Sequence, residues 1–235
     1  MELAPGHDVE LYARVFRQFG RLHIPQVLRE EDAKRIHDAL ANRTPWNLTV
    51  IHNDYFYDVP AEQLVEMSEE KLREVDEEVY QFAARQYEGK YRTLRLSDVG
   101  EPYGGDIPEL TELTEFLNSE PFLDFIRAIT GRDGIDFADA QATCYEKGDF
   151  LHPHFDEDEV KKRVAAYVLN LTPGWRPEWG GLLAYVGPDG HVTEAYTPAW
   201  NALNLLRVEE LHFVSCVAPF APAKRYSVTG WLRGR

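Results

Sequence analysis

The second half of the chain is divided into short strand-like runs, and this pattern limits the fold more than any other feature of the sequence. After residue 135 the runs are IDFADAQATCYEKG, RVAAYVLNLT, GGLLAYVGP, GHVTEAYTP, NALNLLRV, LHFVSCVAP and RYSVTGWLR. Turn residues separate them, at Pro173-Gly174, Gly180-Gly181 and Pro188-Asp189-Gly190. Short strands at this spacing indicate a sandwich, a jelly roll or a barrel.

Helical patterns dominate the first half of the chain. Residues 29–42 carry apolar side chains on one helical face, and residues 61–86 and 109–130 are predicted to form further helices. Between the first two, residues 46–59 are rich in β-branched and aromatic side chains and are predicted to be extended. We prefer an outer strand of the sheet for this segment to a lid or a substrate wall.

These patterns together predict the organisation of the chain. We expect one domain over residues 1–235, mainly β with flanking helices (α+β). Residues 1–135 would form a helical support region with outer strands, and residues 136–235 a double-stranded β-helix (jelly-roll) core.

Composition excludes several function classes. The formal net charge of −15 makes nucleic acid an improbable partner, because phosphate binding needs a basic surface. We expect no membrane span, since no apolar run approaches 18 residues, and no secretory signal. The two cysteines, Cys144 and Cys216, form no CxxC pair, so a reducing cytoplasm is expected. The sequence does not indicate an oligomeric state.

A cluster of potential metal ligands opens the strand-rich half. Residues 150–158 read FLHPHFDED, which places His152, His154 and Asp156 at alternate positions and hence on one face of a strand. The His-x-Asp pair also occurs at His52 and Asp54, which precede an acidic helical stretch. We therefore favour His154 and Asp156 as ligands, and we expect His52 and Asp54 on the surface.

A third ligand must come from elsewhere in the fold. The downstream candidates are His191, in or beside a tight turn, and His212, in an apolar strand. A buried imidazole needs a partner, and a metal ion or a backbone group would both serve. His191 is more typical of a plain surface residue.

The final strand carries a potential anion site. Arg225 and Ser227 share one face by alternation, and an arginine fork with a serine hydroxyl suits a carboxylate. An arginine that points into a small β fold is costly unless an anion meets it. A salt bridge to an acidic side chain at the rim is the competing explanation.

The combination of these features is more specific than any one of them. His154-x-Asp156, then His212, then Arg225-x-Ser227 resembles the iron(II)- and 2-oxoglutarate-dependent dioxygenases. CYEKGDFLHPHFD, RVAAYVLNLTPGWRPEWGGLLAYV and the closing strands around HFVSCV and KRYSVTGWLR resemble the same family. The nearest subgroup is that of the ribosomal-protein and hypoxia-type prolyl hydroxylases, and the match covers residues 140–233, approximately.

The resemblance implies roles for individual residues. His154, Asp156 and His212 would be the catalytic ligands of Fe(II). Arg225 would pair with the distal carboxylate of 2-oxoglutarate. The other expected cosubstrate contacts are Ser227, Tyr145, Tyr167 and Thr229. For Tyr145 a core position with its hydroxyl on a backbone carbonyl is an equal alternative, and Trp231 is expected to pack in the core rather than to contact substrate.

The resemblance also implies a reaction. It is hydroxylation of an unactivated C–H, with O2 as oxidant, release of succinate and CO2, and ascorbate as a further cofactor. Because Asp156 fills the carboxylate position, hydroxylation is favoured over halogenation. The substrate would be a prolyl residue in a protein or peptide, and the acidic surface favours a basic one, such as a ribosomal protein. A small-molecule hydroxylase of the same superfamily remains an alternative.

Two rival hypotheses use the same residues differently. In a cupin-type metalloenzyme, His152 and His154 would bind metal together with Glu159, without 2-oxoglutarate. The position of Gly148 and the sequence before His212 depart from the cupin pattern. We therefore expect His152 to orient a ligand, to contact substrate or to lie solvated on the surface. A non-catalytic module that has kept the barrel is the third hypothesis.

Overall fold

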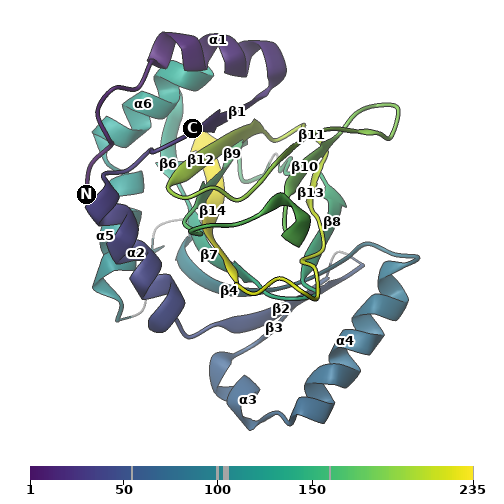
Figure 1. The fold of residues 1–235 in the computed structure, drawn as a ribbon. Helices are drawn as coiled ribbons and strands as arrows, with labels where there is room; N and C mark the ends of the chain where they lie inside the picture. The colour runs from purple at the N-terminus through teal and green to yellow at the C-terminus, as the bar shows by residue number, and fades with distance from the viewer. Residues whose placement is uncertain (54, 99–100, 103–105, 159, 235) are drawn as a thin grey trace.

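The computed structural model describes residues 1–53, 55–98, 101–102, 106–158 and 160–234 (Figure 1). The strands are β1 (Arg21–Ile24), β2 (Asn47–His52), β3 (Tyr55–Val59), β4 (Glu88–Asp98), β5 (Glu101–Pro102), β6 (Ile135–Ala138), β7 (Ala140–Tyr145), β8 (Phe150–His154), β9 (Arg163–Asn170), β10 (Leu183–Val186), β11 (Val192–Tyr196), β12 (Ala202–Arg207), β13 (His212–Val214) and β14 (Arg225–Gly234). The helices are α1 (Val9–Phe19), α2 (Glu30–Asn42), α3 (Ala61–Glu66), α4 (Glu69–Ala83), α5 (Pro108–Leu117) and α6 (Glu120–Thr130), with a 3-10 turn at Pro177–Trp179.

The strands form one antiparallel sheet that curls into a nearly closed barrel (Figure 1). In the described part of the chain, the path runs β1-β12-β9-β14-β7-β4-β8-β13-β10-β11. The two end strands, β1 and β11, are joined by a side-chain ion pair: the Arg21 Nε atom lies 2.6 Å from a carboxylate oxygen of Glu194. The expected mainly β fold with a jelly-roll core is therefore confirmed.

The first half of the chain contributes more strands than its sequence indicated. β1 pairs with β12, and β4 lies between β7 and β8 in the middle of the sheet. Neither strand was predicted. β2 and β3 extend the sheet from β4, so residues 46–59 do form outer strands. Ile51 and Phe56 also line the cavity described below, so the preference for an outer strand over a cavity wall holds only in part.

Two of the three predicted helices are interrupted. α2 lies where it was expected, but the segment over 61–86 divides into α3 and α4, and the segment over 109–130 into α5 and α6. Ser68 begins α4 because its hydroxyl accepts a hydrogen bond from the Lys71 backbone N–H. Pro121 stands in the first turn of α6, where the N–H that it lacks is not needed.

The helices form two groups around the barrel (Figure 1). α1, α2, α5 and α6 cover one side, where their apolar faces and the outward residues Ala142, Leu169 and Val228 form the main core. α3 and α4 lie on another side, beside β2 and β4. Because inward and outward residues alternate along each strand, Ser227 points into the barrel while Val228 packs against the helices. No described helix has the length and apolar character of a membrane span.

Candidate active site

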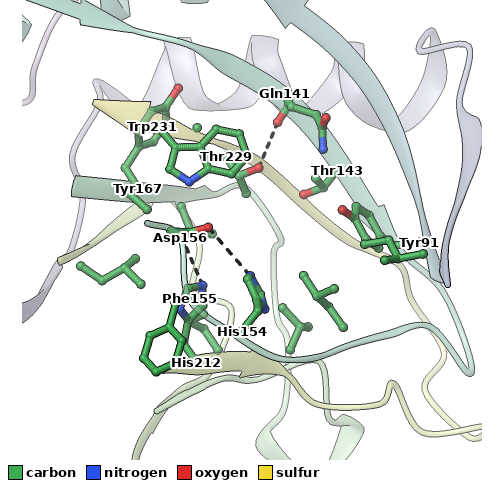
Figure 2. A pocket seen from close by; sticks show the side chains of 18 of the residues that line it. Tyr91, Gln141, Thr143, His154, Phe155, Asp156, Tyr167, His212, Thr229 and Trp231 are labelled. Atoms are coloured by element: carbon green, nitrogen blue, oxygen red, sulfur yellow. Dashed lines mark hydrogen bonds and ion pairs between the residues drawn. The ribbon is translucent and has the colours of Figure 1, made fainter. Parts of the chain in front are cut away.

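Three of the expected ligands meet inside the barrel. β8 and β13 are neighbouring antiparallel strands, and their register places His154 directly opposite His212. Asp156 follows the end of β8, where its backbone N–H donates to the Val208 carbonyl. One potential ligand atom from each of these three residues lies within 4.8 Å of the others (Figure 2). Among the described residues, this is the group that could hold a metal ion.

Backbone carbonyls orient both imidazoles. The Nδ1 atom of His154 lies 2.8 Å from the His152 carbonyl, and that of His212 lies 2.8 Å from the Glu210 carbonyl. Both rings must therefore carry their proton on Nδ1 when neutral, which leaves the lone pair of Nε2 for a metal. The two Nε2 atoms lie 3.9 Å (His154) and 3.5 Å (His212) from the carboxylate oxygens of Asp156.

Burial and mutual repulsion favour the uncharged imidazole at this centre. Burial lowers the pKa of His154, and the neighbouring His212 lowers it further, while Asp156 acts in the opposite direction. A metal ligand must be unprotonated, so the lowered pKa prepares the site for a cation. Two neutral histidines and one carboxylate on one side of an ion leave its other side open to exchangeable ligands.

Arg225 on β14 is the most unusual charged group in the barrel. It is 2% exposed, and its Nε and Nη1 atoms have no hydrogen-bond partner among the described residues. Burial lowers the pKa of Arg225, while Tyr145, whose ring centroid lies 5.0 Å from the guanidinium carbon, acts in the opposite direction. A buried guanidinium without a carboxylate partner destabilises the folded protein. The site is therefore suited to binding an anion that supplies this partner.

Hydroxyl groups gather near this arginine. The Ser227 and Thr143 hydroxyl oxygens lie 2.8 Å apart, and both side chains are buried. Tyr145 lies on the adjacent strand in register with Arg225, and burial raises the pKa of its hydroxyl well above the usual value. Tyr145 also borders the cavity that contains the three ligands. Its predicted role as a cosubstrate contact is therefore sterically possible, and it stays a prediction.

Two other expected cosubstrate residues are engaged with the backbone. Tyr167 borders the cavity, but its hydroxyl donates to the Asp139 carbonyl at 2.7 Å. Thr229 also borders it, and its hydroxyl lies 3.5 Å from the Gln141 carbonyl (Figure 2). Contacts from these residues to a cosubstrate stay predictions. For Tyr167 such a contact would have to use the ring or an acceptor lone pair of the oxygen.

The remaining histidines lie away from the ligands. His152 lies opposite Glu88 by strand register, and its Nδ1 atom lies 3.1 Å from the Gln86 carbonyl, so only its main chain orients His154. His191 is exposed beside a turn, as expected. His52 keeps 33% of its side chain accessible, as expected for a residue at the surface, and its Nδ1 atom lies 2.8 Å from a Glu88 carboxylate oxygen. Asp54 and Glu159 lie outside the described residues.

The structure adds residues that the sequence did not reveal. The ligands border a cavity of about 710 Å³, and Arg163, Trp231 and Tyr91 also line it. The Arg163 guanidinium carbon lies 3.5 Å from the centre of a Trp231 ring, and its Nη1 donates to the Asp156 carbonyl at 3.2 Å. The Trp231 ring therefore faces the cavity in addition to packing on the core. Tyr91 of β4 stacks on Tyr145, with ring centroids 5.0 Å apart.

Known proteins share both the sequence motifs and the fold of this chain. The family model described as the 2OG-Fe(II) oxygenase superfamily matches residues 140–233, the segment that carries all three ligands and Arg225. This segment therefore has the sequence features of that superfamily. The curated relatives that the chain resembles include prolyl hydroxylases. The chain is 27% identical over 166 residues to the prolyl 3-hydroxylase OGFOD1 of Mus musculus, a match that covers 63% of this chain and 30% of the relative.

Solved prolyl hydroxylases share the architecture. A Pseudomonas putida prolyl-4-hydroxylase superposes with a TM-score of 0.62 and 16% identity, over 97% of this chain and 99% of the other. A Trichoplax adhaerens prolyl hydroxylase, solved with a hypoxia inducible factor peptide fragment, gives a TM-score of 0.60 and 14% identity, over 96% and 89% of the two chains. At this identity the likeness shows the fold alone. The alignments span less than a third of the length of the curated relatives.

The residues present fit the two groups that the superfamily implies. Two ligands that bind one ion at about 2.1 Å are at most about 4.2 Å apart. The Asp156 carboxylate oxygens lie 3.9 Å and 3.5 Å from the two imidazole nitrogens, and one ligand atom of each residue lies within 4.8 Å of the others, so the three side chains are gathered about as closely as one ion requires. The cationic Arg225, in the same cavity and without an anionic partner among the described residues, fits a carboxylate of 2-oxoglutarate. Iron(II) and 2-oxoglutarate are therefore both compatible with this cavity.

Proposed function

We propose that the protein is an Fe(II)- and 2-oxoglutarate-dependent hydroxylase that acts on a prolyl residue of a protein or peptide. The observation that carries this proposal is the pairing of two sites in one cavity. A three-residue metal centre and a buried, anion-seeking Arg225 both border it. Neither a structural metal site nor a core salt bridge requires that combination.

The side chains have distinct tasks in this proposal. His154, Asp156 and His212 hold the iron, and the His152 and Glu210 carbonyls fix the tautomers of the two imidazoles. Arg225 binds the distal carboxylate of 2-oxoglutarate. Tyr145 lies opposite Arg225 on the paired strand β7, and Ser227 lies two residues further along β14, so both side chains assist. When bound, iron and 2-oxoglutarate supply oxidation of an unactivated C–H bond with release of succinate and CO2.

The rim of the cavity suits an apolar ring carried by a polypeptide. Phe56 of β3 and Phe155 border the cavity and are 65% and 54% exposed. Exposed aromatic side chains at a cavity mouth are typical of interaction sites. The names of the mouse and Trichoplax adhaerens proteins support a prolyl substrate. The net charge of −15 favours a basic polypeptide, since attraction raises the rate of encounter.

The position of His152 counts against the cupin-type alternative. That hypothesis needs the His152 imidazole at the metal, whereas its side chain is not among the described ones that line the cavity or that form the three-residue metal group. We also propose ascorbate as a supporting reductant and the cytoplasm as the location. The proposal of ascorbate follows from the family resemblance. The proposal of the cytoplasm follows from the two unpaired cysteines.

A peptide assay tests the proposal. Purified protein with Fe(II), 2-oxoglutarate and ascorbate is incubated with proline-containing basic peptides from a fractionated lysate, and succinate and peptide masses are measured. We expect succinate together with the gain of one oxygen on proline, and neither with His154→Ala. Oxygen gain on a small molecule but on no peptide would contradict the prolyl assignment, and absence of succinate under all conditions would contradict the enzyme assignment.

A further inference from the structure

The last strand of the barrel is held in place by one aspartate that contacts neither the metal ligands nor Arg225. Asp139 is buried between β6 and β7, and its carboxylate oxygen Oδ1 accepts a hydrogen bond from the Trp231 backbone N–H at 2.6 Å. Its other carboxylate oxygen pairs with the buried Arg233. Its own backbone N–H donates to the Trp231 carbonyl at 3.1 Å. Both backbone groups of Trp231 are thus fixed by this residue.

The main chain approaches Asp139 as closely as glycine allows. A Cβ atom on Gly230 would lie 1.9 Å from the Asp139 carbonyl oxygen. That same carbonyl accepts the Tyr167 hydroxyl at 2.7 Å, from the neighbouring strand β9. Asp139 therefore joins β7, β9 and β14 at one point, beside the side chains that line the cavity wall.

The contacts continue from Trp231 to the metal centre. The Trp231 ring borders the cavity and carries the Arg163 guanidinium 3.5 Å from a ring centre. Arg163 in turn donates to the main-chain carbonyl of Asp156, a metal ligand, at 3.2 Å. A stacked guanidinium follows the position of the ring beneath it, because its attraction depends on the approach to the ring face.

We infer that Asp139 is a positioning residue. It fixes the position of Trp231, and the Trp231 ring in turn fixes the position of the Arg163 side chain, which lines the cavity beside the metal site. This inference rests on the proposed function, since it assumes a metal ion on His154, Asp156 and His212. It assigns Asp139 no contact with substrate or cosubstrate. Small displacements of such a supporting residue matter, because active-site geometry must be held to about 0.5 Å.

Two double variants separate hydrogen bonding from charge. Both replace Arg233 by Met, so that no buried guanidinium is left without its carboxylate. In Asp139→Asn/Arg233→Met the amide oxygen still accepts the Trp231 N–H. In Asp139→Ala/Arg233→Met that acceptor is lost. Any difference in the position of Trp231 between the two variants is therefore due to the hydrogen bond to the Trp231 N–H. Equal melting temperatures of the two variants would show that a loss of overall stability does not cause that difference.

Fluorine NMR of fluorotryptophan-labelled protein measures where Trp231 lies. Its resonance is assigned by its absence from Trp231→Phe, and manganese(II) broadens each resonance according to its distance from the metal site. We expect equal broadening of the Trp231 resonance in wild type and in Asp139→Asn/Arg233→Met. In Asp139→Ala/Arg233→Met we expect the broadening of the Trp231 resonance to change by about twofold or more, or the resonance to split in two, because the ring no longer stays within the tolerance that the site requires.

The failures of the two claims give different results. If both double variants broaden Trp231 as wild type does, Asp139 is not a positioning residue, while the metal centre stands. If manganese(II) broadens no tryptophan resonance of the wild-type protein selectively, the metal centre itself is wrong, and the inference falls with it.

Discussion

Replacement of Arg225 by Met should have opposite effects on the free protein and on its complex. Without ligand, the guanidinium is 2% exposed and has no carboxylate partner among the described residues. Exchange of a buried charge for an apolar side chain of similar length often stabilises a protein by about 1–4 kcal/mol. We therefore expect the free energy of unfolding of ligand-free Arg225→Met to rise by about 1–3 kcal/mol.

In the complex the same change removes the partner of a buried carboxylate. Loss of one member of such a pair costs about 2–5 kcal/mol of binding free energy, which weakens 2-oxoglutarate binding roughly 30- to 4,000-fold. Wild-type protein at a cosubstrate concentration of about 100 Kd should gain about 2.7 kcal/mol, and the variant about 0.9 kcal/mol or less.

Urea unfolding with and without manganese(II) and 2-oxoglutarate measures both effects. Arg43→Met, which removes an exposed arginine paired with Glu109, is the control, and it should leave the cosubstrate effect unchanged. Destabilisation of ligand-free Arg225→Met would show that the guanidinium has a structural role. Stabilisation of the variant by 2-oxoglutarate equal to that of wild type would refute the cosubstrate assignment.

Three further substitutions test other parts of the site. Ser227→Ala should weaken 2-oxoglutarate binding by about 1 kcal/mol, roughly fivefold, because one hydroxyl is lost, and calorimetric titration would show this. His152→Ala should keep metal affinity within about threefold, since only its carbonyl orients His154, and a large loss of bound metal would revive the cupin hypothesis. Burial raises the pKa of Asp149 from 3.8 to about 6, so the folded state holds this proton more tightly and stability from it is lost as pH rises through about 6. The free energy of unfolding of wild type relative to Asp149→Asn should therefore fall by about 2 kcal/mol between pH 4 and pH 7, and a pH-independent difference would contradict the raised pKa of Asp149.

The metal centre was predictable because it depends on local patterns. The His-x-Asp spacing keeps His154, at the end of β8, and Asp156, just after it, close together, and the apolar surroundings of His212 required a partner for its imidazole. Arg225 and Ser227 followed from the alternation of side chains along β14. All of these residues lie within the segment that the family model matches.

The parts that were missed depend on register between distant strands. Arg163 and Trp231 are far apart in sequence, and they meet because β9 and β14 pair with Trp231 opposite Ala166. β4 was missed because its sequence, EGKYRTLRLSD, mixes charged and polar residues with apolar ones and alternates regularly only over Leu94-Arg95-Leu96. Tyr91, which β4 carries into the cavity, was lost with it.

Calorimetric titration of 2-oxoglutarate in the absence of oxygen tests the central claim most directly, that the metal centre and Arg225 form one site. Manganese(II)-loaded wild-type protein should bind one 2-oxoglutarate per chain. The metal-free protein and His154→Ala should bind it much more weakly, and Arg225→Met should bind it at least about 30-fold more weakly than wild type. Equal binding by metal-loaded and metal-free protein, or by Arg225→Met and wild type, would contradict the account.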